Sequence, residues 1–290
     1  MKVFYNPKQS VENNPSFSPS AGKPAKVVKD WLDSGLHIEI VDNFYPVTRE
    51  DLYRAHNIKY VDDVLDLKID NGFNNRLKTI ADSLMWTNGS FLYAAHEAYH
   101  NGENVCSPTS GFHHAEFNAG MGFCTFNGLM VAALELKRTT SIKKVAIIDI
   151  DMHYGNGTVD ICNKLKVDWI NHYTFGENLQ YHSQVKIFNS DAWLERLPGI
   201  IKQTLNGCNI AFYQAGADPH VDDPFGGALT TKQLKERDEI VFGIAQEMGV
   251  PIVWNLAGGY QEDFNEVLKI HRNTAIECLK LEKRNYNNGW

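Results

Sequence analysis

Short apolar runs alternate along the chain with longer stretches in which apolar residues recur every three or four positions. Val, Ile and Phe dominate the short runs, and several runs are unbroken, which is typical of strands buried on both faces of a sheet. The runs predict strands at 2–5, 38–41, 145–150, 169–172, 210–214 and 252–256, with a shorter one near Val105. The longer stretches predict helices at roughly 48–56, 74–100, 125–138, 192–205, 231–248 and 262–281.

The order of these elements predicts an α/β fold with a central, mainly parallel, doubly wound sheet flanked by helices. Residues 9–25 are rich in Pro, Ser and Asn and predict a loop, which lies too near the start to divide domains. A length of 290 residues suits one α/β domain with a large sheet, so we expect a single domain over 1–290. Thr48 with Asp51 predicts one helix N-cap, and Thr230 or Thr231 predicts another.

Composition narrows the class of protein. Hydrophobic residues make up 43% and charged residues 22%, as in a globular protein with a substantial core. A net charge of −7 argues against a nucleic-acid partner. No apolar run of about 18 residues predicts a membrane span, and the start lacks the apolar run of a signal peptide. Five scattered cysteines without a C-x-x-C pair predict reduced thiols and a cytoplasmic location.

Polar residues that carry chemistry collect just after four of the predicted strands. The strand at 145–150 runs into DIDMHYGNG at 149–157, and the strand at 210–214 runs into AGADPH at 215–220. The strand at 252–256 runs into AGGY at 257–260, and SGFHH at 110–114 follows Val105. Ligands bind outside the carboxyl ends of strands in open parallel sheets. We therefore expect these four segments to meet at one site.

Asp151 and His153 are two residues apart, so both point to one side of an extended segment. With Asp218 they offer two carboxylates and one imidazole. This set has no sulfur and suits a divalent metal such as zinc, with positions left for water or substrate. The open positions indicate a catalytic rather than a structural metal.

Three further side chains complete the candidate chemistry. His113 and His114 are adjacent, and at least one would face the metal site as a general base. Tyr260 follows two glycines, which let the backbone turn sharply and direct the phenol inward. A phenol beside a metal would stabilise an oxyanion. Metal, base and oxyanion donor together indicate hydrolysis of a carbonyl compound.

The segments that carry these residues resemble the zinc-dependent histone deacetylase and acetylpolyamine amidohydrolase family. The resemblance rests on SGFHHA at 110–115, GFCTFN at 122–127, DIDMHYGNG at 149–157, AGADPHVDDP at 215–224 and AGGY at 257–260, all in the family's order. TREDLYRAHNIKYV at 48–61 resembles the family's early helix. The resemblance implies an arginase/deacetylase-type α/β fold. It also implies removal of acetyl groups from acetylated lysine side chains or acetylated polyamines.

Carried over residue by residue, the resemblance makes Asp151, His153 and Asp218 the ligands of one zinc ion per chain. It makes His114 the general base and then acid, and gives His113 an electrostatic role. Tyr260 would polarise the acetyl carbonyl.

The resemblance also assigns supporting residues. Asp149 and Asn156 would orient the histidines, and Asp149 with nearby backbone carbonyls would hold a potassium ion. The substrate would contact Gly122, Phe123, Gly258 and Gly259. Phe123 would form one wall of a narrow tunnel, and Phe175 and Tyr181 are candidates for the second wall.

The chain departs from the family pattern at three positions near the site. Tyr154 stands where many members have a second histidine, Asn156 is neutral as in the class II pattern, and Ala257 replaces a common glutamate. These changes bear on substrate choice or rate more than on reaction type. The sequence leaves the acyl group, the amine and the oligomeric state open.

Three other functions remain possible from the residues. The pentad HEAYH at 96–100 has the H-E-x-x-H spelling of a zinc metalloprotease helix, but no third ligand follows at the spacing of the compact motif. An arginase-like hydrolase with two metals would need more carboxylates, and position 220 is His. A non-catalytic module that binds acyl-lysine is disfavoured, because every catalytic position is filled.

Overall fold

The computed structural model describes residues 1–12, 15–179, 185 and 188–287. Its centre is a seven-stranded sheet in the order β2-β1-β3-β7-β6-β4-β5, in which every pairing is parallel. Each strand coincides with a run that the hydrophobic pattern predicts, so the parallel sheet is confirmed. The strands are β1 (Lys2–Phe4), β2 (Glu39–Val41), β3 (Val105–Cys106), β4 (Val145–Asp149), β5 (Ile170–Thr174), β6 (Ile210–Gln214) and β7 (Ile252–Asn255).

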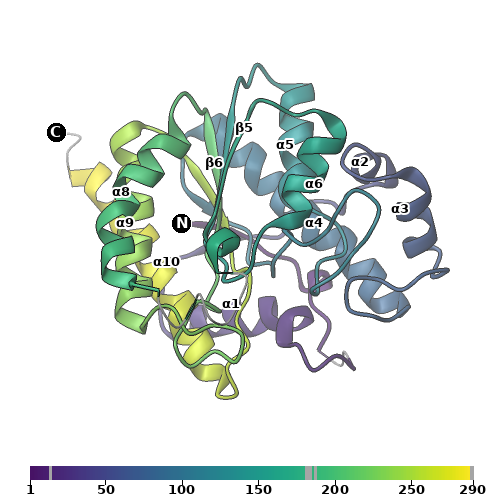
Figure 1. Ribbon diagram of the computed structural model, residues 1–290, viewed down its shortest axis with the longest axis horizontal. Coiled ribbons are helices and arrows are strands. Elements are labelled where there is room, and N and C mark those ends of the chain that lie inside the picture. The colour runs from purple at the N-terminus through teal and green to yellow at the C-terminus, as the bar shows by residue number, and fades with distance from the viewer. Residues whose placement is uncertain (13–14, 180–184, 186–187, 288–290) are drawn as a thin grey trace.

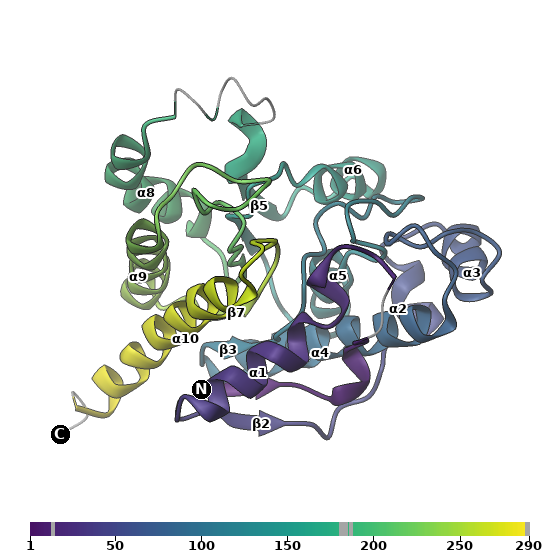
Figure 2. The same ribbon diagram turned by 90° about the horizontal axis from the view of Figure 1, so that it is seen from below.

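Helices cover both faces of this sheet (Figure 1). One layer consists of α1 (Lys23–Asp33), α8 (Ser190–Leu205), α9 (Thr231–Met248) and α10 (Phe264–Asn287). Figure 2 shows α1 and α10 lying side by side in this layer. The other layer consists of α4 (Lys78–Asn101), α5 (Gly128–Thr139) and α6 (Asn156–Leu165), with α2 (Arg49–Tyr53) and α3 (Ile58–Leu65) packed outside it. The described residues also include three short 3-10 helices: η1 (Pro7–Gln9), η2 (Pro19–Ala21) and η3 (Phe175–Asn178).

The unbroken apolar runs reflect burial of the strands on both faces. All five residues of β4 are buried. Ile148 belongs to the core shared with α8, α9 and α10, whereas Val145 and Ile147 belong to the core shared with α4 and α5. Alternate side chains of one strand therefore fill two cores.

Two of the predicted helix caps are present. The Thr48 hydroxyl accepts a hydrogen bond from the Asp51 N–H at 3.3 Å, and the Asp51 carboxylate accepts one from the Thr48 N–H at 2.7 Å. Thr230, rather than Thr231, forms the equivalent cap with Gln233. Both are capping boxes, which satisfy backbone donors that the first turn leaves unpaired.

The hydrophobic pattern misses three helices, and each has a local cause. α1 begins at Lys23, inside the predicted loop 9–25, with Pro24 in its first turn, where proline is well tolerated. α3 is a separate helix because the Asn57 side chain accepts a hydrogen bond from the N–H of Tyr60. α6 begins at Asn156. This residue stands between Gly155 and Gly157, and a Gly-Asn-Gly triplet by itself is typical of a turn.

The carboxyl ends of β3, β7, β6 and β4 lie next to one another at one edge of the sheet. The four polar segments identified in the sequence leave these strands, so the fold brings them to one place. No helix among the described residues has the length and hydropathy needed to traverse a lipid bilayer.

Candidate metal centre

Asp151 and His153 lie in the loop between β4 and α6, and Asp218 lies in the loop after β6. His153 Nδ1 is 3.0 Å from Asp151 Oδ1 and 3.0 Å from Asp218 Oδ2. One potential ligand atom from each residue lies within 4.8 Å of the others, and no other such triplet occurs among the described residues. Two carboxylates and one imidazole match the donor set of a catalytic zinc site that keeps positions open.

Both carboxylate oxygens of Asp218 are buried and receive no well-aligned hydrogen bond, although His153 Nδ1 lies 3.0 Å from Oδ2. Burial and the negative charge of Asp151 raise the pKa of Asp218, because two neighbouring carboxylates repel each other away from water. A divalent cation between these groups would satisfy the oxygens and remove the repulsion. The residues present therefore fit a zinc ion.

Gly258, in the loop after β7, packs directly against the carboxylates of Asp151 and Asp218. Its N–H donates to Asp151 Oδ2 at 2.8 Å. A Cβ at position 258 would lie only 2.4 Å from the Asp218 carboxylate carbon and Oδ2. Only glycine fits here without moving a ligand.

The paired histidines differ in their hydrogen-bond partners. Their rings are 4.1 Å apart between centroids. His113 Nδ1 lies 2.7 Å from Asp149 Oδ2, whereas His114 Nδ1 lies 2.6 Å from the amide oxygen of Asn156. Asp149 is negatively charged when ionised and Asn156 is neutral, so the two rings sit in different electrostatic surroundings.

These surroundings set opposite charge states for the two rings. Burial disfavours the charged form of His113, but the carboxylates of Asp149 and Asp151 outweigh it and raise its pKa to about 9. Burial and the neighbouring His113 lower the pKa of His114 to about 4. These shifts favour the neutral form of His114, which can accept a proton, and the charged form of His113.

Tyr260 is tied to the loop that follows Asp218. Its N–H donates to Asp223 Oδ2 at 2.7 Å, and Asp223 Oδ1 accepts from the N–H of Phe225 at 3.0 Å. The tyrosine lines the metal pocket. Burial, with the charges of Asp151 and Asp218, raises the pKa of Tyr260 well above its ordinary value, so the phenol keeps its proton and can donate it in a hydrogen bond.

Lys23 is a site residue that the sequence does not reveal. Its side chain is fully buried, and its ammonium donates to the carbonyl of Ala257. Ala257 has a φ of 50°, a left-handed conformation that non-glycine residues seldom adopt. Burial lowers the pKa of Lys23 to about 8, although the carboxylates of Asp218 and Asp151 oppose this change. A single lysine in a predicted loop carries no signal of this contact.

Of the predicted substrate contacts, Gly122, Phe123 and Gly258 line the pocket. Gly122 has a φ of 54°, and a Cβ there would lie 2.5 Å from the His114 ring. Gly259 faces the other way, because its Cβ would meet Val267 at 3.0 Å. The ring of Phe123 lies 5.8 Å from that of Tyr260, so the first predicted wall stands beside the pocket.

One of the two predicted candidates for the second wall, Phe175, does not stand at the pocket. Phe175 is only 4% exposed and packs into the core against Trp193, with ring centroids 4.7 Å apart. Tyr181 lies outside the described residues. Phe225 instead borders the pocket, with its ring 5.2 Å from that of Tyr260 and 6.3 Å from that of His153. In the sequence, Phe225 directly follows the Asp-Asp-Pro that ends the motif at 215–224, and this position could have identified it as a pocket residue.

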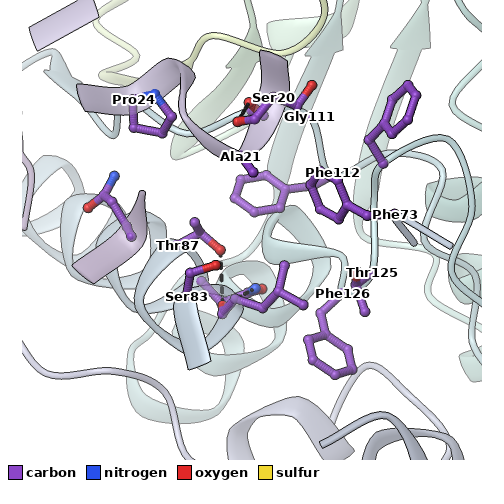
Figure 3. A pocket seen from close by; sticks show the side chains of 15 residues that line it. Ser20, Ala21, Pro24, Phe73, Ser83, Thr87, Gly111, Phe112, Thr125 and Phe126 are labelled. Atoms are coloured by element: carbon purple, nitrogen blue, oxygen red, sulfur yellow. Dashed lines mark hydrogen bonds between the residues drawn. The ribbon is translucent and has the colours of Figure 1, made fainter. Parts of the chain in front are cut away.

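A second, deeper cavity of about 30 Å³ adjoins the metal pocket and shares Ser20, Gly111 and Phe123 with it. Figure 3 shows that Ser83 and Thr87 of α4 line this cavity together with the ring of Phe112. The volume corresponds to about two water molecules. Its lining holds none of the candidate metal ligands or catalytic side chains, so the cavity is no alternative to the metal pocket as the reaction site.

The HEAYH pentad lies on α4, away from the four strand ends. His96 and His100 stack on each other with ring centroids 5.9 Å apart. Glu97, the general base of the metalloprotease interpretation, forms an ion pair with Lys2. Among the described residues, no third side chain joins the two histidines in a metal-binding triplet.

His220 is likewise unavailable to a second metal. Its Nε2 lies 2.9 Å from the Thr231 hydroxyl, and its Nδ1 accepts a hydrogen bond from the N–H of Asp222 at 3.1 Å. Both ring nitrogens are thus engaged by groups at the start of α9 and in its own loop. This arrangement argues against an arginase-like pair of metals.

Comparison with known proteins agrees with this geometry. The family model for the histone deacetylase domain matches residues 20–171, just over half of the chain. The chain therefore belongs to the histone deacetylase domain family.

Individual relatives are distant. The chain is 26% identical over 182 residues to an uncharacterised protein of Picosynechococcus, covering 58% of this chain and 59% of the relative. It is 31% identical over 145 residues to the chloroplastic histone deacetylase 14 of Arabidopsis thaliana, covering 43% of this chain and 34% of the relative. The chain thus spans 59% and 34% of the length of these two curated relatives.

Solved structures share the fold over nearly the whole chain. The HDA15 HD domain matches with a TM-score of 0.77 and 17% identity, covering 97% of this chain and 90% of the other. An acetylpolyamine aminohydrolase from Burkholderia pseudomallei matches with a TM-score of 0.71 and 18% identity, covering 96% and 98%. At this identity the likeness concerns the fold alone, and it confirms the predicted fold class.

Proposed function

We propose that the protein is a zinc-dependent deacylase that hydrolyses the amide of acetylated amines. The observation that carries this proposal is the triplet of Asp151, His153 and Asp218, in which both carboxylates are buried within reach of one imidazole. Membership of the histone deacetylase family supports the reaction class. Acetyl-lysine in peptides and acetylated polyamines are both candidate substrates.

The side chains around the triplet match the needs of amide hydrolysis. A zinc ion held there would supply a Lewis acid for the carbonyl oxygen and would lower the pKa of a water molecule. His114, neutral at pH 7, takes a proton from the attacking water and returns it to the leaving amine. Tyr260 donates a hydrogen bond to the carbonyl oxygen as negative charge develops on it. Acetate and a free amine are the products.

The neighbouring groups keep these side chains in place. Asp149 orients His113 and favours its charged form, which stabilises negative charge near the reacting carbonyl. Asn156 orients His114 without adding a charge, so this ring remains a base. Partners of this kind fix the tautomer and basicity of a histidine.

The remaining parts of the proposal concern cofactor and location. We expect one zinc ion per chain. The potassium ion implied by the family stays a prediction that elemental analysis of purified protein would test. The cytoplasmic location that the scattered cysteines predict stays a prediction.

The test is a panel of acetylated lysine peptides, lysine peptides with longer acyl groups and acetylated polyamines, offered to zinc-loaded protein. We expect turnover of at least one amide, and we expect a hydroxamate, which binds zinc, to stop it. Absence of turnover on every amide would contradict the proposal. Zinc-free protein that still binds acetyl-lysine would point instead to a non-catalytic binding module.

A further inference from the structure

Four aromatic side chains form a ring of contacts beside the metal pocket, which we call the mouth, and two of them, Phe123 and Tyr260, line the pocket itself. Phe17 contacts Phe123 with ring centroids 5.3 Å apart and Phe225 at 6.3 Å. Phe123 and Phe225 each contact Tyr260, at 5.8 Å and 5.2 Å. The contacts therefore run in a closed circuit, and Phe17 joins the two walls on the side opposite Tyr260.

The pocket beside these rings is narrow, although His153 keeps 36% of its side chain exposed and also borders a wider cavity of about 460 Å³. The volume of the narrow pocket is about 10 Å³, and it is bounded by the metal ligands Asp151 and His153, by His114 and by Tyr260. A cavity of about 10–15 Å³ holds one water molecule. An acetamide group is several times larger, so side chains that line the pocket must move before a substrate can fill it.

Backbone hydrogen bonds fix the positions of three of the four aromatic residues. Asp223 accepts hydrogen bonds from the N–H groups of Tyr260 and Phe225 and so ties both to one buried carboxylate. The N–H of Phe123 donates to the Gly72 carbonyl at 3.0 Å, and its ring also packs against Phe73 at 5.9 Å.

Phe17 is held differently. Its side chain is 77% exposed, which is unusual for an aromatic residue, and it packs against the rings of Phe123 and Phe225. The backbone directly after it is fixed, because the Ser18 hydroxyl caps η2 by accepting the Ser20 N–H at 3.2 Å. The ring of Phe17 can therefore turn away from the mouth while its backbone stays beside it.

We infer that Phe17 restricts the site to small acylated amines and disfavours acetyl-lysine within a polypeptide. The inference rests on the proposed deacylase function. A slender, unbranched chain passes between Phe123 and Phe225 once the Phe17 ring turns aside. A peptide backbone, in contrast, branches at the point where the stem leaves the pocket, and there it meets Phe17. The phenyl ring also offers no hydrogen-bond partner to a peptide.

A matched pair of substrates tests this inference. N-acetylcadaverine and an N-acetyl-lysine tripeptide carry the same acetamide on the same stem and differ in the peptide backbone. For the wild-type protein we expect kcat/KM for N-acetylcadaverine to exceed that for the tripeptide at least ~10-fold, the scale of a steric exclusion at a binding site. For Phe17→Ala we expect the ratio to fall at least ~5-fold, through improved turnover of the tripeptide.

The control variant is Tyr45→Ala, which removes another exposed aromatic side chain, 72% exposed, that takes no part in the mouth. We expect it to leave the substrate ratio unchanged, and Phe17→Leu to give an intermediate ratio. Equal turnover of both substrates by the wild type, or an unchanged ratio in Phe17→Ala, would overturn the inference. Failure of the deacylase proposal looks different, because neither substrate would then be hydrolysed by zinc-loaded protein.

Discussion

Gly258→Ala tests how closely the loop after β7 is fitted to the metal ligands. The added Cβ would lie 2.4 Å from Asp218 Oδ2, about 1 Å short of ordinary van der Waals contact. Metal–ligand distances tolerate changes of only about 0.2 Å, so the carboxylate or the loop must shift by more than the site allows. We expect zinc affinity to fall by about 10- to 100-fold, as it does when a group that positions a metal ligand is lost. Competition with a chromophoric zinc chelator measures this directly.

Gly243→Ala is the matched control for this substitution. Gly243 lies inside α9, and no atom lies within 4 Å of a Cβ built there. Alanine is favoured over glycine inside a helix by about 0.5–1 kcal/mol, so this variant should gain stability and keep the zinc affinity of the wild type. Wild-type zinc affinity in Gly258→Ala would refute the close packing of this loop on Asp218.

Three further predictions address catalysis and stability. Tyr260→Phe should lower kcat by about 10²–10³-fold without loss of zinc, as for removal of an oxyanion donor, and full activity would contradict its role. Asn156→Asp should move the acidic limb of the pH profile of kcat/KM to higher pH. The reason is that a carboxylate raises the pKa of His114, and this ring acts as a base only when it is neutral. An unchanged profile would argue against His114 as the base. Burial lowers the pKa of His56 to about 4, so the folded protein resists its protonation. The stability that depends on neutral His56 is fully present above its ordinary pKa of 6.5 and is lost as the pH falls toward 4. Urea unfolding should therefore show about 2 kcal/mol less stability at pH 5 than at pH 7. The His56→Gln variant should lack this contribution to the pH dependence.

The strand ends could be predicted from the sequence because burial on both faces leaves a strong local pattern. β4 reads as an unbroken apolar run, and Asp149, Asp151 and His153 come at or directly after its end. The same reasoning applied to β6 and β7 locates Asp218 and Tyr260. The structure brings these side chains together through the parallel pairing of the strands, which the alternation of strands and helices already indicates.

Contacts between distant loops could not be predicted. Lys23 touches Ala257, and Phe17 touches Phe225, across more than two hundred positions of the chain. Phe175 was expected at the pocket but lies in the core, because the chain turns into η3 directly after β5. Such contacts depend on how loops pack over the sheet, and hydrophobic periodicity carries no information about that packing.

The most direct test of the whole account is the metal content of two variants, measured by elemental analysis after purification and zinc loading, alongside their hydrolysis of acetylated amines. The account predicts one zinc ion per chain in the wild type, unchanged zinc and turnover in His96→Ala, and loss of both in Asp218→Ala. Zinc retained by Asp218→Ala and lost from His96→Ala would contradict it, and would locate the metal on α4 instead.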